Sequence, residues 1–451
     1  SSSSSSKMQR IVSLLETASS VLPEDEGSVL VSPLYAWVLD RCVLDSKQKD
    51  GIRPDMRDGA WDNMVDSSLA WAAINTGPFD DPGLLYLDDK VLLHRLLTTT
   101  KKESSSSSPL VVENHDDDAA PVDSFWPTSY ILPEDVMHFQ QHAAAVEGST
   151  PSKRQEQQQQ ESVLSKPWIL KERAGYGSHG NSLATTEDVI RYCDNQNSSM
   201  LSSNKEESLL CQTVIDPPLL IDGRKCSLRV YVIYFLDDSS MITSNSQSSP
   251  GGCSIYLCNE GLVKLAALPY NSSSGDENDV QMTNSGRGRG RGVGSDDEKT
   301  NEDNDDVATQ YDFRYLKKEL EARGWDYEND LWNGIRSSVC TVMGQYQNNL
   351  RQEEDATTSS SVMRRKLARL GLPKILGLDF VLEEKNHPER YIVPWLLEVN
   401  RFPGLEPRGS SDSFVKQTVV VQDAWRCAAK RRLGETGDNS LDIASLEYLE
   451  L

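Results

Sequence analysis

The sequence has no long hydrophobic run and no regular cysteine spacing. The most apolar stretch near its start, Ile11 to Leu22, is interrupted by Glu16 and several hydroxyl residues, and no run approaches the length that spans a bilayer. The eight cysteines show no repeating pattern, and Cys253 and Cys258 have no histidine partner, which argues against a disulfide framework and a zinc site. These absences predict a cytosolic protein of a reducing compartment that has no membrane partner.

Basic residues are also scarce. The chain of 451 residues carries 46 Lys and Arg against 69 Asp and Glu, so its net charge is −23. A negative charge of this size repels phosphate backbones and slows encounter with them. We therefore expect no nucleic-acid partner, and we interpret the basic run at 430–432 as solvated surface.

Several stretches lack the apolar residues that folding requires. They are rich in serine, glutamine, glycine or acidic residues, and they occupy 1–6, 104–108, 157–160 and 271–306. Such segments cannot bury enough apolar surface to offset the entropy lost on ordering. The sequence therefore predicts tails, linkers and insertions at these places.

Two apolar runs near the C-terminal end, Ile375 to Leu382 and Ile392 to Val399, predict two strands joined by a polar turn. Side chains alternate along a strand, so Glu398 and Asn400 point the same way, and antiparallel pairing brings Asp379 alongside them. Two carboxylates and an amide suit Mg²⁺, which takes its other oxygens from water and nucleotide phosphates. The alternative is that both carboxylates are ordinary surface charges at strand ends.

A glycine-rich loop follows the predicted strand at 166–171. Three of its glycines match the dinucleotide-binding pattern G-x-G-x-x-G: Gly175, Gly177 and Gly180. In a dinucleotide fold this loop runs directly into a helix. Here a short strand, 181–184, intervenes, and the helix begins only at Thr185 with a capping box to Asp188. The order favours a flap over phosphates, with Lys171 as a solvent-facing charge on the entering strand; a plain hairpin and a dinucleotide-dependent oxidoreductase remain alternatives.

A hairpin is predicted at 219–235, with its turn at Asp222-Gly223. Beyond the turn Lys225, Ser227 and Arg229 alternate with apolar residues and share one face. This basic stripe suits a phosphate site, although an exposed edge strand would carry the same pattern. Shorter strands are expected at 254–257 and 262–266, and the apolar spacing over 331–346 predicts a core helix.

Taken in order, these segments resemble the tubulin-tyrosine ligase-like family of ATP-grasp enzymes. The blocks that carry the resemblance include INTGPFDDPGLLYLDDK, KPWILKERAGYGSHG, LLIDGRKCSLRVYVIYF, ILGLDFVL and LLEVNRFPG. The resemblance implies an α+β fold in which antiparallel sheets sandwich a nucleotide site, with a small N-terminal α/β lobe and disordered insertions. The expected division is an N-terminal tail (1–59), an N-terminal lobe (60–146) with a Ser-rich insertion (103–124), a linker (147–162), a central lobe (163–270), a disordered insertion (271–310), a C-terminal lobe with the metal site (311–433) and a tail (434–451).

The resemblance also implies roles for individual residues. The residues expected to contact nucleotide phosphates are Lys90, Lys171, Lys225 and Asn284, with the three glycines closing over the phosphates, and those expected to contact adenine are Gln212, Val214 and Ile215. The expected metal ligands are Asp379, Glu398 and Asn400. The residues expected to contact substrate are Arg229 and Lys264, and those expected to act in catalysis are Lys225, Arg229 and Glu398. The family commonly has aspartate, arginine and histidine where this sequence has Ser227, Lys264 and Gln281, so the acceptor end of the site is altered.

The expected function is an ATP- and Mg²⁺-dependent carboxylate–amine ligase. By resemblance it would add tyrosine, glutamate or glycine to a carboxylate of tubulin, with tubulin or microtubules as partner and a cytoplasmic location associated with the cytoskeleton or cilia. A catalytically impaired member that binds nucleotide or tubulin is the alternative.

Overall fold

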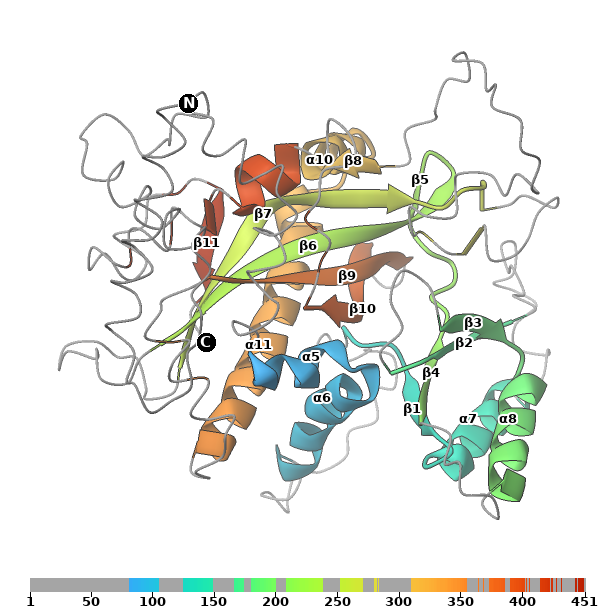
Figure 1. Ribbon diagram of the computed structural model, residues 1–451. Helices are drawn as coiled ribbons and strands as arrows, with labels where there is room; N and C mark the ends of the chain where they lie inside the picture. The colour runs from blue at the N-terminus through green and yellow to red at the C-terminus, as the bar shows by residue number, and fades with distance from the viewer. Residues whose placement is uncertain are drawn as a thin grey trace, which may run out of the picture.

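The structure, a computed structural model, describes residues 81–104, 125–148, 166–173, 180–199, 208–237, 252–270, 310–354, 373–385, 390–401, 414–421 and 445–449, with a few individual residues between these ranges. The N-terminal tail, most of the glycine loop and the C-terminal tail as predicted from sequence lie largely or wholly outside them. Within them, two sheets and their helices form the fold (Figure 1).

The smaller sheet has the strand order β1-β4-β2-β3, with every pair antiparallel. Its strands are β1 (Ser129–Leu132), β2 (Trp168–Lys171), β3 (Asn181–Ala184) and β4 (Leu209–Thr213). Helices α7 (Val136–Gly148) and α8 (Thr186–Ser199) pack beside it (Figure 1). Phe139 and Trp168 meet edge to face at 4.9 Å in the apolar core between the sheet and its helices.

The larger sheet has the order β10-β9-β6-β7-β11, and two short strands pair outside this order, β5 with β6 and β8 with β7. Its strands are β5 (Leu220–Ile221), β6 (Arg224–Leu236), β7 (Cys253–Leu265), β8 (Gln310–Asp312), β9 (Lys374–Lys385), β10 (Tyr391–Asn400) and β11 (Leu446–Leu449). β6 is buried along its whole length after Arg224, because β7 and β9 cover both its edges. The basic stripe therefore lies on a central strand and not on an exposed edge.

The helices around this sheet are η3 (Pro82–Leu84), α5 (Leu85–Asp88), α6 (Lys90–Ser104), α10 (Phe313–Ala322), η6 (Tyr327–Trp332), α11 (Asn333–Glu354) and η7 (Phe414–Val421). α11 runs across the sheet, and its predicted apolar stripe is buried against it (Figure 1). None of the described helices combines the length and apolar character needed to cross a membrane.

Local sequence signals account for most of these elements. Asp222 and Gly223 have φ of 51° and 70°, as the predicted tight hairpin turn requires. The capping box of α8 forms in both directions: the Asp188 N–H donates to Thr185 Oγ1, and the Thr185 N–H donates to Asp188 Oδ2. One expectation was wrong: the two short strands after 250 are a single strand, β7, that bends at a register shift opposite β6.

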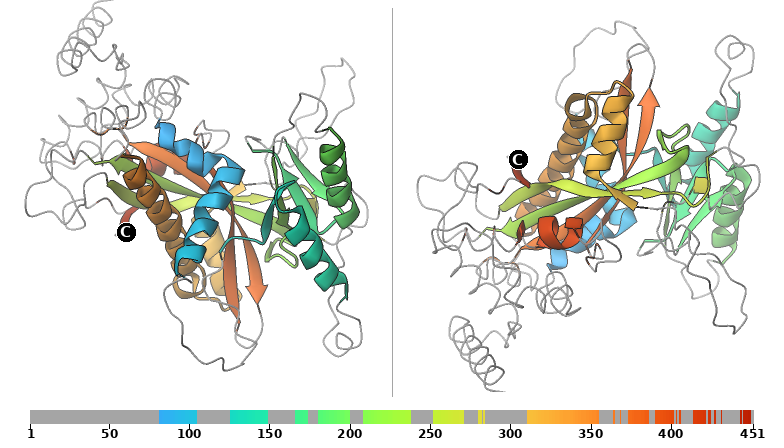
Figure 2. Two further views of the ribbon diagram at one scale, coloured as in Figure 1. Left: turned by 90° about the horizontal axis from the view of Figure 1, so that it is seen from below. Right: turned by 90° about the horizontal axis from the view of Figure 1, so that it is seen from above.

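The two sheets face each other where the small sheet meets one end of the large one. The small sheet and its helices lie at one end of the long strands, as the views from below and above show (Figure 2). The element order and the antiparallel pairing confirm the predicted α+β fold.

Candidate functional site

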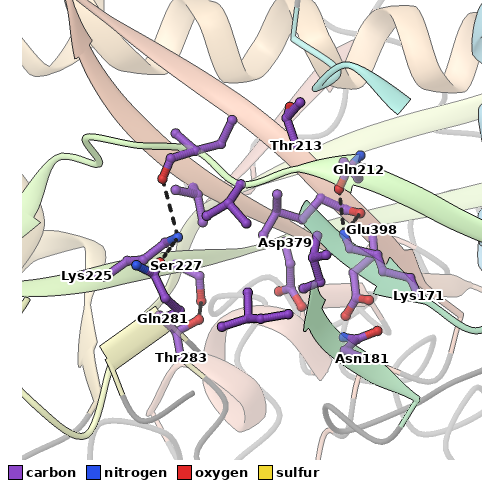
Figure 3. Close-up of a pocket in the computed structure, with 16 residues that line it drawn as sticks. Lys171, Asn181, Gln212, Thr213, Lys225, Ser227, Gln281, Thr283, Asp379 and Glu398 are labelled. Carbon is purple, nitrogen blue, oxygen red and sulfur yellow. Dashed lines mark hydrogen bonds between the residues drawn. The ribbon is translucent and has the colours of Figure 1, made fainter. Parts of the chain in front are cut away.

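A cavity lies between the two sheets (Figure 3). About 720 Å³ of empty space, part of it open to solvent, separates the lining side chains. The small sheet contributes Ile169, Lys171, Asn181, Leu183, Gln212 and Thr213, the following segment Val214 and Ile215, and the large sheet Lys225, Ser227, Asp379, Val381, Leu397 and Glu398, with Gln281 and Thr283 closing one end. One part of the wall is therefore apolar and the rest charged.

The three residues predicted to hold a metal lie together on β9 and β10. Glu398 pairs with Asp379 and Asn400 with Gly377, so the predicted alternation is confirmed. Asn400 Nδ2 lies 3.3 Å from Asp379 Oδ2 and 3.5 Å from Glu398 Oε1, which brings both carboxylates around one amide group. Oxygen donors of this kind fit a hard cation that also binds phosphates. In the described part of the chain no group of three or more His, Cys, Asp or Glu gathers as a metal cage, so such a cation has only these two carboxylates.

Asp379 is the more constrained of the two carboxylates. Arg229 binds it in a bidentate manner, with Nη2 2.6 Å from Oδ2, and Lys264 Nζ lies 3.5 Å from Oδ1. Burial raises the pKa of Asp379, but the charges and hydrogen bonds of Arg229 and Lys264 outweigh it and lower this pKa to about 2. Glu398 is freer, since its nearest cation, Lys90, is 3.6 Å away and its side chain is 20% exposed. Glu398 is therefore the carboxylate better able to hold an ion.

Lys171 is not the solvent-facing charge that the sequence suggested. Its side chain is buried at 2% exposure, and Nζ donates to Gln212 Oε1 at 2.6 Å and to Leu397 O at 3.1 Å. The register shift between Leu396 and Glu398 takes Leu397 out of the ladder and leaves its carbonyl available. Gln212 in turn donates to Ser129 Oγ, so its buried side chain holds the lysine in place.

Burial lowers the pKa of three lysines around the cavity to about 8. For Lys171 and Lys225 the loss of solvation dominates, and for Lys264 the nearby Arg229 charge adds to it. Lys171 and Lys225 line the cavity and donate to the neutral oxygens of Gln212 and Gln281, while Lys264 and Arg229 pair with Asp379. A polyanionic ligand would favour the ammonium forms of all three lysines.

Asp89 caps the N-terminus of helix α6 and fixes it beside the site. Asp89 Oδ1 accepts from the N–H groups of Val91 and Leu92, while Oδ2 pairs with Arg173 Nε at 2.7 Å. The Lys90 N–H also donates to Arg173 O, so this helix is tied to the end of β2. Lys90 begins the helix, as predicted, and its side chain reaches Glu398.

The three residues that differ from the resembled family are bonded within the site. Gln281 Oε1 accepts from Lys225 Nζ at 2.8 Å, and Thr283 Oγ1 lies 2.6 Å from Ser227 Oγ (Figure 3). Lys264 pairs with Asp379. Gln281 and Thr283 fall within the range predicted as a disordered insertion, 271–310, so part of that range belongs to the site. Thr283 and Asn181 were not singled out from the sequence, and only their place in the fold identifies them.

Other predicted site residues are placed as follows. Val214 and Ile215 line the cavity, and Gly180, with φ of 77°, begins the return to β3. Gly175, Gly177 and Asn284 lie outside the described residues. The glycine loop leads into the antiparallel strand β3 before α8 starts, which overturns the dinucleotide-fold alternative, because that fold needs a helix directly after the loop.

Comparison with known proteins accounts for this arrangement. A sequence profile described as the tubulin-tyrosine ligase family matches residues 80–427. The chain belongs to this family. The match covers both sheets up to η7, and the fold is that of an ATP-grasp-like member of the tubulin-tyrosine ligase family.

The individual members of the tubulin-tyrosine ligase family that match this chain have low sequence identity to it. The chain is 24% identical over 237 residues to tubulin polyglutamylase TTLL6 of Mus musculus (51% of this chain, 25% of the relative), and 23% identical over 314 residues to tubulin polyglutamylase TTLL7 of Homo sapiens (67% and 28%). It is 24% identical over 225 residues to a probable beta-tubulin polyglutamylase of Tetrahymena thermophila (48% and 16%). The chain thus spans about a quarter or less of the length of these relatives.

Proposed function

We propose that this protein is an ATP-dependent ligase that joins an amino acid to a protein carboxylate. The observation that carries the proposal is the cavity between the two sheets, which Lys171 and Lys225 line together with Asp379 and Glu398, while Lys90, Lys264 and Arg229 pair with these two carboxylates. A nucleoside triphosphate with a divalent ion fits this charge balance, and the apolar wall of Ile169, Leu183 and Val214 suits an adenine ring.

The position of each residue suggests which part of the nucleotide or substrate it would bind. Lys90 and Lys171 would bind the phosphates near Glu398, while Lys225 and Arg229 would face the terminal phosphoryl group and the reacting carboxylate. Glu398, with Asp379 and Asn400, would hold Mg²⁺. When bound, this ion neutralises phosphate charge and orients the phosphates for in-line transfer.

The reaction proceeds in two balanced steps. A carboxylate oxygen of the acceptor attacks the γ-phosphorus of ATP, so that an acyl phosphate forms and ADP leaves. The nitrogen of the incoming amino acid then attacks the acyl carbon, phosphate leaves with the former carboxylate oxygen, and the surplus amine proton passes to solvent. Lys225 and Arg229 stabilise the negative charge that develops in both steps.

The relatives support tubulin as the acceptor, because their names describe tubulin polyglutamylases. We propose a tubulin carboxylate as substrate and glutamate as the first amino acid to test, with tyrosine and glycine as the others. A cytoplasmic place on the cytoskeleton belongs to the same proposal.

The test is incorporation of radiolabelled glutamate, tyrosine or glycine into purified tubulin with ATP and Mg²⁺. We expect label with the wild type and at most a trace with Glu398→Gln. Equal incorporation by both proteins would contradict the assignment of the site. Mass spectrometry of the tubulin tails would then identify the modified residue.

A second candidate is a member that binds nucleotide or tubulin without ligation. It is favoured by the acceptor end, where Ser227, Gln281 and Lys264 are bonded within the protein. Tight binding of Mg²⁺–ATP without any incorporation would support this candidate. Failure to bind Mg²⁺–ATP would refute the ligase, and failure to bind tubulin as well would refute this candidate.

A further inference from the structure

Asn181 presents a buried oxygen to the nucleotide cavity. Its Oδ1 atom is shielded from solvent and finds no hydrogen-bond donor in the part of the chain that the structure describes. The residue lines the cavity, on the same side as Lys171 and Glu398 (Figure 3). An unpaired buried oxygen destabilises the free protein, so a partner supplied by a ligand would relieve this penalty.

The position of Asn181 follows from the β2–β3 pairing. Asn181 lies directly opposite Lys171, and the next pair on that face is Leu183 opposite Ile169. Directly opposed side chains on antiparallel strands lie close together, so Asn181 and Lys171 mark the point where the wall changes from apolar to charged. Lys171 is bonded to the carbonyl of Leu397, the residue before Glu398, which places Asn181 at the end of the cavity that holds the carboxylates.

The chemistry of Asn181 Oδ1 indicates which kind of ligand atom can bind it. A carboxamide oxygen only accepts hydrogen bonds or binds cations, whereas phosphate oxygens at neutral pH offer no donor. Among the described residues, two carboxylates are placed to bind a divalent ion in this site, and Arg229 and Lys264 already occupy one of them. Mg²⁺ requires six oxygens and keeps several waters, so a further neutral oxygen at this wall suits it.

We propose that Asn181 Oδ1 is an oxygen ligand of the divalent ion that accompanies the nucleotide, bound directly or through one of the ion's waters. The inference rests on the nucleotide site proposed above, and it adds a metal-binding residue from the opposite sheet. The ion would then link the small sheet, through Asn181, to Glu398 on the large sheet.

The test compares wild type with Asn181→Leu, which keeps the size of the side chain and removes its polar atoms. Without ligand, the variant should melt at the same temperature or higher, because an unpaired oxygen is gone. Calorimetric titration should show affinity for Mg²⁺–ATP reduced by about tenfold to a hundredfold, the range for residues that support a bound metal. Affinity for ATP in excess EDTA should not change.

Two further variants separate the outcomes. Asn181→Asp keeps an oxygen at this place and should retain the Mg²⁺-dependent part of the affinity. Asn349→Leu is a matched control on α11, since it removes an unpaired buried amide nitrogen far from the cavity lining; it should leave ligand affinity unchanged. An equal loss of affinity with and without Mg²⁺ would mean that Asn181 contacts the nucleotide itself, and no loss at all would mean that it contacts neither; both results overturn the proposal. Wild type that fails to bind Mg²⁺–ATP would overturn the proposed function together with it.

Discussion

The buried Lys171 makes the sharpest prediction about the site. Burial lowers its pKa from the ordinary value of 10.5 to about 8, which at about 1.4 kcal/mol per pKa unit corresponds to roughly 3 kcal/mol against the charged form. The substitution Lys171→Met keeps the length of the side chain and removes this charge. It also removes the donor of Gln212 Oε1, at 2.6 Å, and of Leu397 O, at 3.1 Å, at a cost of about 1–3 kcal/mol for each acceptor left unsatisfied.

These effects oppose each other and are of similar size. We therefore expect ligand-free Lys171→Met and wild type to have similar free energies of unfolding at pH 7.5 in urea denaturation. The variant's stabilisation by saturating Mg²⁺–ATP should fall well below that of wild type, because a phosphate contact is lost. A salt bridge that served only stability would give the reverse: removal of a buried partner would cost about 3–5 kcal/mol, and the gain from ligand would be unchanged.

The pH dependence supplies an independent check. Below pH 8 Lys171 is protonated in both the folded and the unfolded chain, so the full penalty is present. Between pH 8 and 10.5 the unfolded chain binds more protons than the folded one, so the free energy of unfolding rises with pH. The difference in stability between wild type and Lys171→Met should therefore shift by roughly 2 kcal/mol in favour of wild type from pH 7.5 to 10, most of the total. Lys317→Met, at an exposed lysine on α10, is the control; a constant difference for both variants would refute the reasoning.

Three further predictions concern the walls of the cavity. Glu398→Gln should change the melting temperature in chelator only slightly, since its ion pair is long and partly exposed, and it should lose most of the gain from Mg²⁺–ATP; a large drop in chelator would show a structural role instead. Gly377→Ala places a Cβ 2.8 Å from Arg229 Cδ, so it should displace Arg229 from Asp379 and weaken nucleotide binding in titration, and unchanged affinity would contradict this coupling. Gly180→Ala forces an L-residue to φ of 77° and should lower the unfolding free energy by about 1–2 kcal/mol, as chemical denaturation can measure; a neutral effect would mean that the loop end relaxes freely.

The sequence by itself determined the local parts of this site. The alternation in the run before Asn400 placed that residue and Glu398 on one face, and the turn after Leu382 implied the antiparallel return that brings in Asp379. The Asp222-Gly223 turn and the helix start at Thr185 were likewise readable, because each depends on residues within a few positions of one another. Resemblance to a family extended this reading to the fold and the nucleotide.

Only the tertiary structure decided how these parts meet. Arg229 finds Asp379 through the pairing of β6 with β9, across 150 positions of sequence, and this pairing makes the carboxylate a partner of cations. Lys171 is buried because two sheets face each other, whereas the strand pattern alone left it free to face solvent. Gln281 lies in a stretch whose composition predicts disorder, yet it is buried and accepts a hydrogen bond from Lys225 on a strand 56 positions earlier. Local propensities and side-chain alternation do not encode which strands become neighbours, so burial, ion pairing and the shifted pKa values of the site follow from the fold alone.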